Sequence, residues 1–176
     1  MKYFLISTER TNNPIPNIID WHKQIEYRDI TSERAGNIPE WTMLAIDNEI
    51  DIVFTDILSK PGFLVSPMVH DTMRLYDPYV QCKRVVLKDR LTHAEEQYFL
   101  PIFPVCDCLL PESKLNMDRS NIIHGVIDQE KVKRHPFFKV GGVSNTHIAF
   151  RLDVVESILR RGAKGIKLSE LELKEG

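Results

Sequence analysis

The 176 residues suffice for one domain of ordinary size, and a content of 43% hydrophobic and 27% charged residues is typical of a folded globular protein. The 23 basic and 25 acidic side chains give a formal net charge of −2, the wrong sign for a protein that clamps a phosphate backbone. No apolar run approaches the ~20 residues that cross a bilayer, the N-terminus lacks the pattern of a secretory signal, and the three cysteines fit no disulfide framework. We therefore expect a cytoplasmic protein.

The first third of the sequence predicts two strands joined by irregular structure. Aromatic and β-branched residues over 2–7 predict the first strand, and the turn formers over 8–20 predict a loop. The mixed polarity of 21–39 predicts irregular structure with one helical turn. Over 44–54, isoleucines alternate with carboxylates, which predicts a strand with one apolar and one acidic face.

Two helices, each set between strands, give the clearest local signals. Ser66 as N-cap and Pro67 as first helical residue predict a helix that ends at Asp77, between strands at 63–65 and 82–87. Asp153, with Glu156 three residues later, predicts a capping box for a second helix that ends at Gly162. This helix lies between predicted strands at 146–152 and 165–168. We expect each pair of flanking strands to be parallel.

The other segments predict further strands. The run over 98–110 contains Pro101 and Pro104, which predict an edge or bulged strand, and further strands are expected at 122–127 and 137–143. The chain therefore predicts a single α+β (mixed α/β) domain over residues 1–176. It should hold a mixed, mainly antiparallel sheet with two short strand–helix–strand units.

Enzymatic chemistry finds little support in the sequence. Cys106 and Cys108 have one residue between them and the six histidines are scattered, which does not fit a zinc site; burial as small side chains is the simpler interpretation. No cysteine precedes a helix start that would lower its thiol pKa, and no serine elbow, phosphate loop or dinucleotide fingerprint is present. We therefore expect no catalysis, no cofactor and no metal.

Two charged stretches are candidate binding surfaces. The basic stretch from Lys131 to Lys139 includes Phe137 and Phe138 and could bind single-stranded nucleic acid by stacking, but a solvated loop that leads into a core strand is the simpler interpretation. We therefore expect no nucleic-acid partner. The acidic stretch from residue 40 to 59 contains five acids and no lysine or arginine before position 60. Its carboxylates are either a solvated sheet face or a docking patch for a basic protein.

The order of several short motifs resembles that of a family of bacterial immunity proteins. The motifs are Phe63-Leu64-Val65-Ser66, Val105-Cys106-Asp107-Cys108-Leu109, His147-Ile148-Ala149-Phe150-Arg151-Leu152 and Gly162-Ala163-Lys164-Gly165-Ile166-Lys167-Leu168. Over about residues 60–170 they are similar to polymorphic-toxin immunity family eleven, formerly a domain of unknown function, with residues 1–60 as a variable N-terminal part. The resemblance implies a cytoplasmic protein without catalysis that binds and neutralises a cognate toxin, often one delivered by a secretion system in interbacterial competition.

The resemblance carries no fixed binding residues, so the candidates come from the sequence itself. A row of carboxylates could imitate the phosphate charge that a nuclease toxin binds, and tryptophan is enriched at interface hot spots. We therefore predict that the toxin contacts Trp41, Asp47, Glu49, Asp51 and Asp56. Trp41 is equally suited to the core.

The alternative function is that of a small pocket-bearing enzyme or ligand-binding domain. Its mark would be a concave site where Asp107, His147 and Arg151 converge. A buried ion pair between Asp107 and Arg151 is the simpler expectation for two of these residues. Neither hypothesis involves a membrane.

Overall fold

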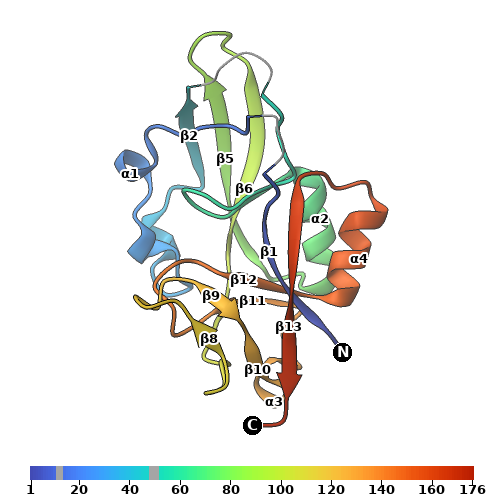
Figure 1. Cartoon of the computed structure of the whole chain (residues 1–176). Coiled ribbons are helices and arrows are strands. Elements are labelled where there is room, and N and C mark those ends of the chain that lie inside the picture. Colours follow the sequence, from blue (N-terminus) through green and yellow to red (C-terminus); the bar gives the residue numbers. More distant parts are fainter. Residues whose placement is uncertain (11–13, 48–51) are drawn as a thin grey trace.

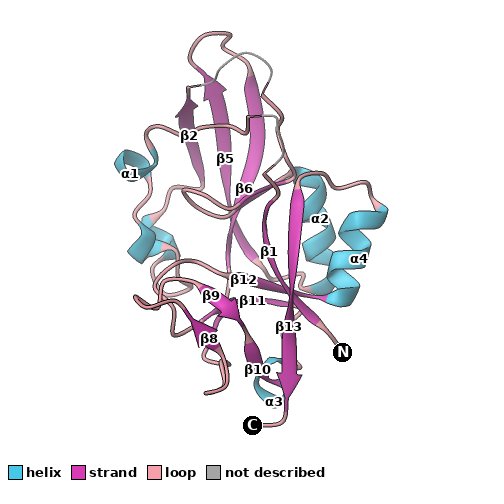
Figure 2. Ribbon diagram, viewed as in Figure 1, coloured by secondary structure: helices cyan, strands magenta, loops and turns pink. Residues whose placement is uncertain are grey.

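A computed structural model gives the fold and describes residues 1–10, 14–47 and 52–176. Within them lie thirteen strands, four α-helices and two 3₁₀ turns, Tyr27–Asp29 and Ala35–Asn37. The helices are α1 (Trp21–Gln24), α2 (Pro67–Tyr76), α3 (Gln129–Val132) and α4 (Leu152–Arg160). The expected α+β class is confirmed, and Figure 2 shows how strands dominate the single domain. No helix in the described part of the chain is both long and apolar enough to cross a membrane.

The larger of two main sheets has six strands and contains the first and last strands of the chain. Its order is β10-β13-β1-β12-β11-β7. The bounds are β1 (Tyr3–Thr8), β7 (Val105–Cys106), β10 (Val126–Asp128), β11 (Phe137–Val140), β12 (Ile148–Arg151) and β13 (Ile166–Lys174). β1 is antiparallel to both of its neighbours, β12 and β13. In Figure 1 this sheet occupies the lower half of the molecule.

The second main sheet has five strands in the order β2-β5-β6-β4-β3 and forms the upper part of Figure 1. Its strands are β2 (Trp41–Ile46), β3 (Ile57–Leu58), β4 (Leu64–Val65), β5 (Gln81–Asp89) and β6 (Glu95–Ile102). A separate hairpin is made of β8 (Lys114–Leu115) and β9 (Ile122–His124). Most neighbouring strands are antiparallel, as expected, but they divide between two main sheets instead of forming one.

The two predicted strand–helix–strand units share one topology. β4 and β5 flank α2, and each is antiparallel to β6, which lies between them. Likewise, β12 and β13 flank α4, and each is antiparallel to β1 between them. Within each unit the flanking strands are therefore parallel, which confirms the prediction. The two helices pack against each other and lie side by side in Figure 1.

The start of α2 is as predicted, whereas the start of α4 is not. The Ser66 hydroxyl caps α2 by accepting the Val69 N–H at 3.4 Å, and Pro67 is the first helical residue. The capping box predicted at Asp153 is wrong, because α4 already begins at Leu152 with Arg151 as its N-cap. The Asp153 carboxylate instead pairs with the Arg151 guanidinium at 2.8 and 2.9 Å.

The strand predicted over 44–54 is wrong at both ends. β2 begins at Trp41 and ends at Ile46, and residues 52–55 are not in a strand. β2 pairs in parallel with β5, and the last pair joins Ile46 to Asp89, where β5 ends. Because β5 ends at Asp89, its ladder with β2 ends at that pair.

The proline-bearing run predicted over 98–110 forms parts of two strands. β6 is not an edge strand, because it lies between β5 and β4. However, β4 pairs with β6 only at Phe99, while Pro101 lies beyond that point and faces Cys82 of β5. At Pro101, β6 therefore pairs with β5 on one side only. The missing N–H of the proline costs no hydrogen bond to β4 there.

One buried cluster joins both sheets and both long helices. Ile57 and Val65 contribute from the five-stranded sheet, and Phe137 and Phe150 from the six-stranded sheet. Val69 of α2, Val154 of α4 and the connecting Phe103 complete the contacts, and the Phe103 and Phe137 rings lie 5.8 Å apart in an edge-to-face arrangement. This shared core makes the two sheets one packing unit.

Candidate functional site

Trp41 lies on the surface and not in the core. Side chains of β2 alternate between two faces, and Thr42, Leu44 and Ile46 are buried. Trp41 and Met43 point to the opposite face, and Trp41 is 51% exposed. The sequence left open whether Trp41 lies in the core or on the surface. The structure places it on the surface, where a binding residue has to lie.

The strand register gives Trp41 a partly apolar surrounding. In the ladder with β5, Trp41 lies opposite Arg84, and Met43 lies opposite Val86. Val86 in turn lies opposite Gln97 of β6. We call these five residues the Trp41 face: Trp41, Met43, Arg84, Val86 and Gln97.

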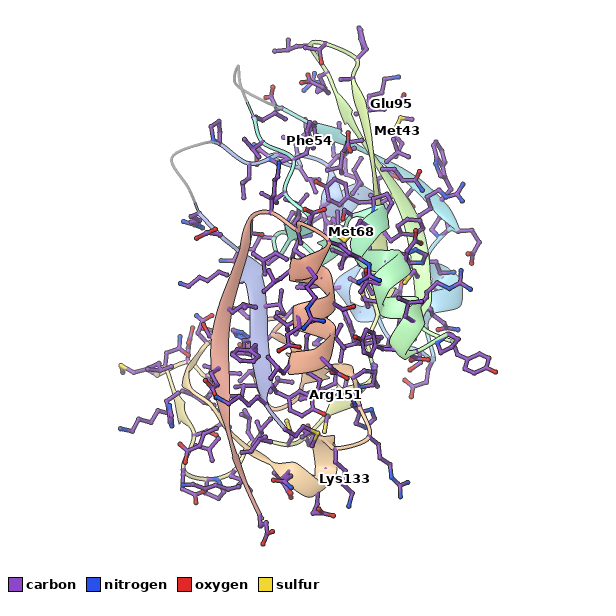
Figure 3. All side chains as sticks on the ribbon, turned by 90° about the vertical axis from the view of Figure 1, so that its right-hand side faces the viewer. Met43, Phe54, Met68, Glu95, Lys133 and Arg151 are labelled. Carbon is purple, nitrogen blue, oxygen red and sulfur yellow. The ribbon has the colours of Figure 1, made fainter. Side chains whose placement is uncertain are left out.

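The Trp41 face has clear borders. At one border the ion pair between Lys88 and Glu95 spans β5 and β6 at 3.2 Å. At another, α2 covers β6, where the His70 ring stacks on Phe99 with centroids 3.9 Å apart. Figure 3 shows Met43 and Glu95 together in the upper part of the molecule, above α2. Between these borders the sheet surface is open to solvent at Trp41, Arg84 and Gln97.

β2 is also an edge strand whose outer side is only partly paired. The Arg84 N–H donates to the Glu40 carbonyl, and the Arg90 N–H donates to the Ile46 carbonyl, so the even-numbered residues of β2 bond to β5. The odd-numbered residues bond outward. Ala45 accepts the Ile19 N–H at 3.1 Å and donates to the Asp20 carboxylate at 2.9 Å.

The other outward backbone groups of β2 belong to Trp41 and Met43. No residue in the described ranges forms a hydrogen bond with them from the outer side. Unpaired backbone groups of an edge strand can bond to a strand of another chain. The free edge and the Trp41 face meet at the same two residues.

The predicted acidic row does not form one patch with Asp56. Asp47 is exposed and follows Ile46, the last residue of β2, whereas Trp41 is the first residue of that strand. Glu49 and Asp51 lie outside the described residues. Glu40, at the other end of β2, forms an ion pair with the buried Lys83 ammonium.

Asp56 is half-buried and bonds to two other segments of the chain, and its predicted contact with the toxin stays a prediction. One carboxylate oxygen accepts the Ser66 hydroxyl at 2.6 Å, and the other accepts the Lys164 backbone N–H at 2.7 Å. The Asp56 backbone also bonds to the backbone of both residues. Asp56 therefore ties the start of α2 to the loop before β13.

The three residues of the alternative hypothesis do not converge. Arg151 pairs with Asp153, and the His147 ring lies 3.1 Å from the Ser120 carbonyl oxygen. The Asp107 carboxylate packs against Gly141. The contact is so close that a Cβ added to this glycine would lie 1.9 Å from a carboxylate oxygen. The expected Asp107–Arg151 ion pair is therefore also wrong.

The remaining candidates for chemistry are buried. Cys106 and Cys108 are both free thiols in the core, and burial raises the pKa of Cys108 to about 12. Phe137 and Phe138 are fully buried in two different clusters, so neither can stack on a nucleic-acid base. No cluster of three or more potential metal ligands occurs among the described residues.

Comparison with known proteins adds no relative. No model of a known protein family matches the sequence, and no curated protein matches it. The resemblance to immunity family eleven therefore stays a prediction.

Sequence reasoning missed Met43, Arg84 and Val86 as members of the Trp41 face. The alternation of buried and exposed residues in β5 places Arg84 and Val86 on its outer face, but no local signal shows that β5 pairs with β2. The juxtaposition depends on a register between segments more than forty residues apart.

Proposed function

We propose that this chain is a binding protein without catalysis, which neutralises a cognate toxin by stoichiometric contact in the cytoplasm of the producing cell. The observation that carries the proposal is the coincidence of an exposed tryptophan and an unpaired strand edge at Trp41 and Met43. The toxin as the partner comes from the resemblance to immunity family eleven.

The Trp41 face has the composition of an interface centre. Tryptophan and arginine are enriched among the residues that dominate binding energy, and Trp41 and Arg84 are neighbours across the β2–β5 ladder. Met43 and Val86 add apolar area that can exclude water. Arg84 forms no ion pair within the described residues, so its guanidinium is available to a partner's carboxylate.

The free edge offers a second, sequence-independent contact. An extended segment of the toxin would add a strand beside Trp41 and Met43 and bond to their backbone groups. Side chains of that segment would then reach the Trp41 face. Asp47, which is exposed just after the end of β2, would steer a basic toxin during association.

The state of the thiols supports a role without nucleophilic catalysis. Burial raises the pKa of Cys82 to about 12, as it does for Cys108, so both remain protonated at neutral pH. Cys106 is also buried, and burial raises its pKa as well.

The proposal predicts that the gene upstream encodes a toxin-like C-terminal domain, and the test is protection and binding with the domain found there. Co-expression of this chain should restore growth of cells that express that domain, and calorimetry should give a 1:1 complex. The W41A variant should bind at least tenfold more weakly, or about 1.4 kcal/mol, because it removes the anchor. Y79A is the matched control, because Tyr79 is 91% exposed and lies outside the Trp41 face.

A proline variant tests strand addition separately. The Met43 N–H points away from β5, so M43P removes an outward donor and leaves the β2–β5 ladder intact. M43P should keep the near-ultraviolet circular dichroism of the parent and bind at least tenfold more weakly. Parental binding by both W41A and M43P would refute this surface, and failure of the parent to protect cells or bind would refute the toxin as partner.

A further inference from the structure

A cavity of about 510 Å³ lies at the junction of the two sheets, away from the Trp41 face. Its wall comes from chain segments within 27–30, 59–63, 100–103 and 144–148, together with Lys139. The volume falls within the range of pockets that hold small organic ligands.

The cavity wall is apolar on one side. Phe63, Phe103 and Ile148 line it, and all three belong to the cluster shared by both sheets. The Phe63 and Phe103 rings meet edge to face with centroids 5.6 Å apart, which fixes their position. A flat apolar group could pack against this wall without rearrangement of the core.

The polar part of the wall is entirely cationic or neutral. Among the described residues of the wall, Lys60 and Lys139 are the charged ones, and none is a carboxylate. Neither lysine forms an ion pair within the described part of the chain. Ser144, Asn145 and Thr146 add hydroxyl and amide groups that can donate hydrogen bonds.

The strand geometry directs Lys139 toward the cavity. In β11, Lys139 lies two residues after Phe137 and therefore points to the same face of the sheet. Phe137 packs in the shared cluster, and Lys139 lies opposite Ile148 in the ladder with β12. The lysine thus extends the apolar wall at the point where the cavity opens.

We propose that this cavity binds a small organic anion with an apolar body. The body packs against Phe63 and Phe103, and the anionic group pairs with Lys60 and Lys139, neither of which forms an ion pair with another described residue. The proposal is independent of the toxin-binding function.

An aromatic sulfonate tests the proposal directly. The dye 8-anilinonaphthalene-1-sulfonate fluoresces in apolar surroundings and carries one negative charge. The parent should bind one dye, and 2-naphthoate should displace it at least tenfold more effectively than the neutral 2-naphthamide. The K60Q/K139Q double variant should bind the dye at least tenfold more weakly.

Two controls separate the cavity from other sites. K167Q removes an exposed lysine of β13 outside the cavity and should bind as the parent does. W41A should also bind normally, because the Trp41 face is elsewhere. Near-ultraviolet circular dichroism checks that each variant is folded, since loosely packed states bind this dye as well.

Unchanged dye affinity in K60Q/K139Q would overturn the proposal, as would loss of binding in W41A. Equal displacement by naphthoate and naphthamide would show an apolar cavity without selectivity for anions, and would overturn it too.

Discussion

Asp56 and Trp41 come from one acidic stretch of sequence, yet the fold gives them different surroundings. The Asp56 carboxylate accepts two hydrogen bonds from residues that are distant in sequence, Ser66 and Lys164. Trp41 faces solvent because its strand buries the opposite face. The sequence predicted Ser66 as a helix cap but held no sign that its hydroxyl bonds to Asp56, so charge alone could not separate an internally bonded carboxylate from a freely exposed side chain.

The ion pair between Arg151 and Asp153 predicts a pH-dependent contribution to stability. Hydrogen bonding to the Arg151 guanidinium lowers the pKa of Asp153 below its usual 3.8. A carboxyl group with a lowered folded-state pKa stabilises the fold above its unfolded pKa, and this contribution is lost as the pH falls through the folded value. Because 47% of the Asp153 side chain is exposed, solvent screening limits the contribution to about 0.5–1 kcal/mol.

The measurement compares the free energy of unfolding of the parent and D153N by urea denaturation. The parent should be more stable near neutral pH, and the difference should shrink below about pH 3.8. Other carboxyl groups titrate in both proteins and cancel in the difference. A difference that stays constant or grows on acidification would contradict the assignment.

At the scale of elements, local signals located the helices better than the strand ends. Ser66 and Pro67 defined the start of α2 because a cap and a helical proline act within one turn. The end of β2 depends on β5, which stops at Asp89, forty-three residues beyond Ile46. The start of β2 at Trp41 likewise depends on the pairing of Trp41 with Arg84, a contact between segments distant in sequence, and the predicted strand over 44–54 does not include it.

The turn between α4 and β13 predicts unequal costs at two glycines. Gly162 and Gly165 both have positive φ, of 82° and 71°. An added Cβ at Gly162 would meet no atom within 4 Å, whereas at Gly165 it would lie 2.2 Å from the Thr55 methyl carbon. G162A should therefore cost about 1–2 kcal/mol from backbone strain, and G165A should cost a further ~1–3 kcal/mol from the clash.

Thr55 cannot easily move away from Gly165. It is buried, and its hydroxyl donates to the Ile57 carbonyl at 2.8 Å. The Thr55 Cβ would also lie 2.6 Å from the added atom, so the clash involves more than the methyl group. Chemical denaturation of G162A and G165A gives the comparison, and equal losses in the two variants would show that backbone strain alone sets the cost.

At the scale of the whole molecule, the sequence indicated the class of fold but not which segments meet. The strand–helix–strand units were visible because each is continuous in the chain. The cavity wall is not continuous: Lys60 and Lys139 come from opposite halves of the sequence, and the basic stretch that contains Lys139 holds no sign of Lys60. A convergence of this kind follows from packing between sheets, which has no local signature.

The shared core predicts that both sheets unfold in one transition. Val154 of α4 is fully buried in the cluster that joins the sheets, so V154A should lower the free energy of unfolding by about 2 kcal/mol. Trp21, buried beside the five-stranded sheet, reports that sheet by fluorescence, and far-ultraviolet circular dichroism reports the whole chain. Both signals should shift to the same lower denaturant concentration.

E156A, on the exposed side of α4, is the control and should stay within ~0.5 kcal/mol of the parent. A tryptophan signal that stays at the parental midpoint while the circular dichroism shifts would mean that the five-stranded sheet folds independently of α4.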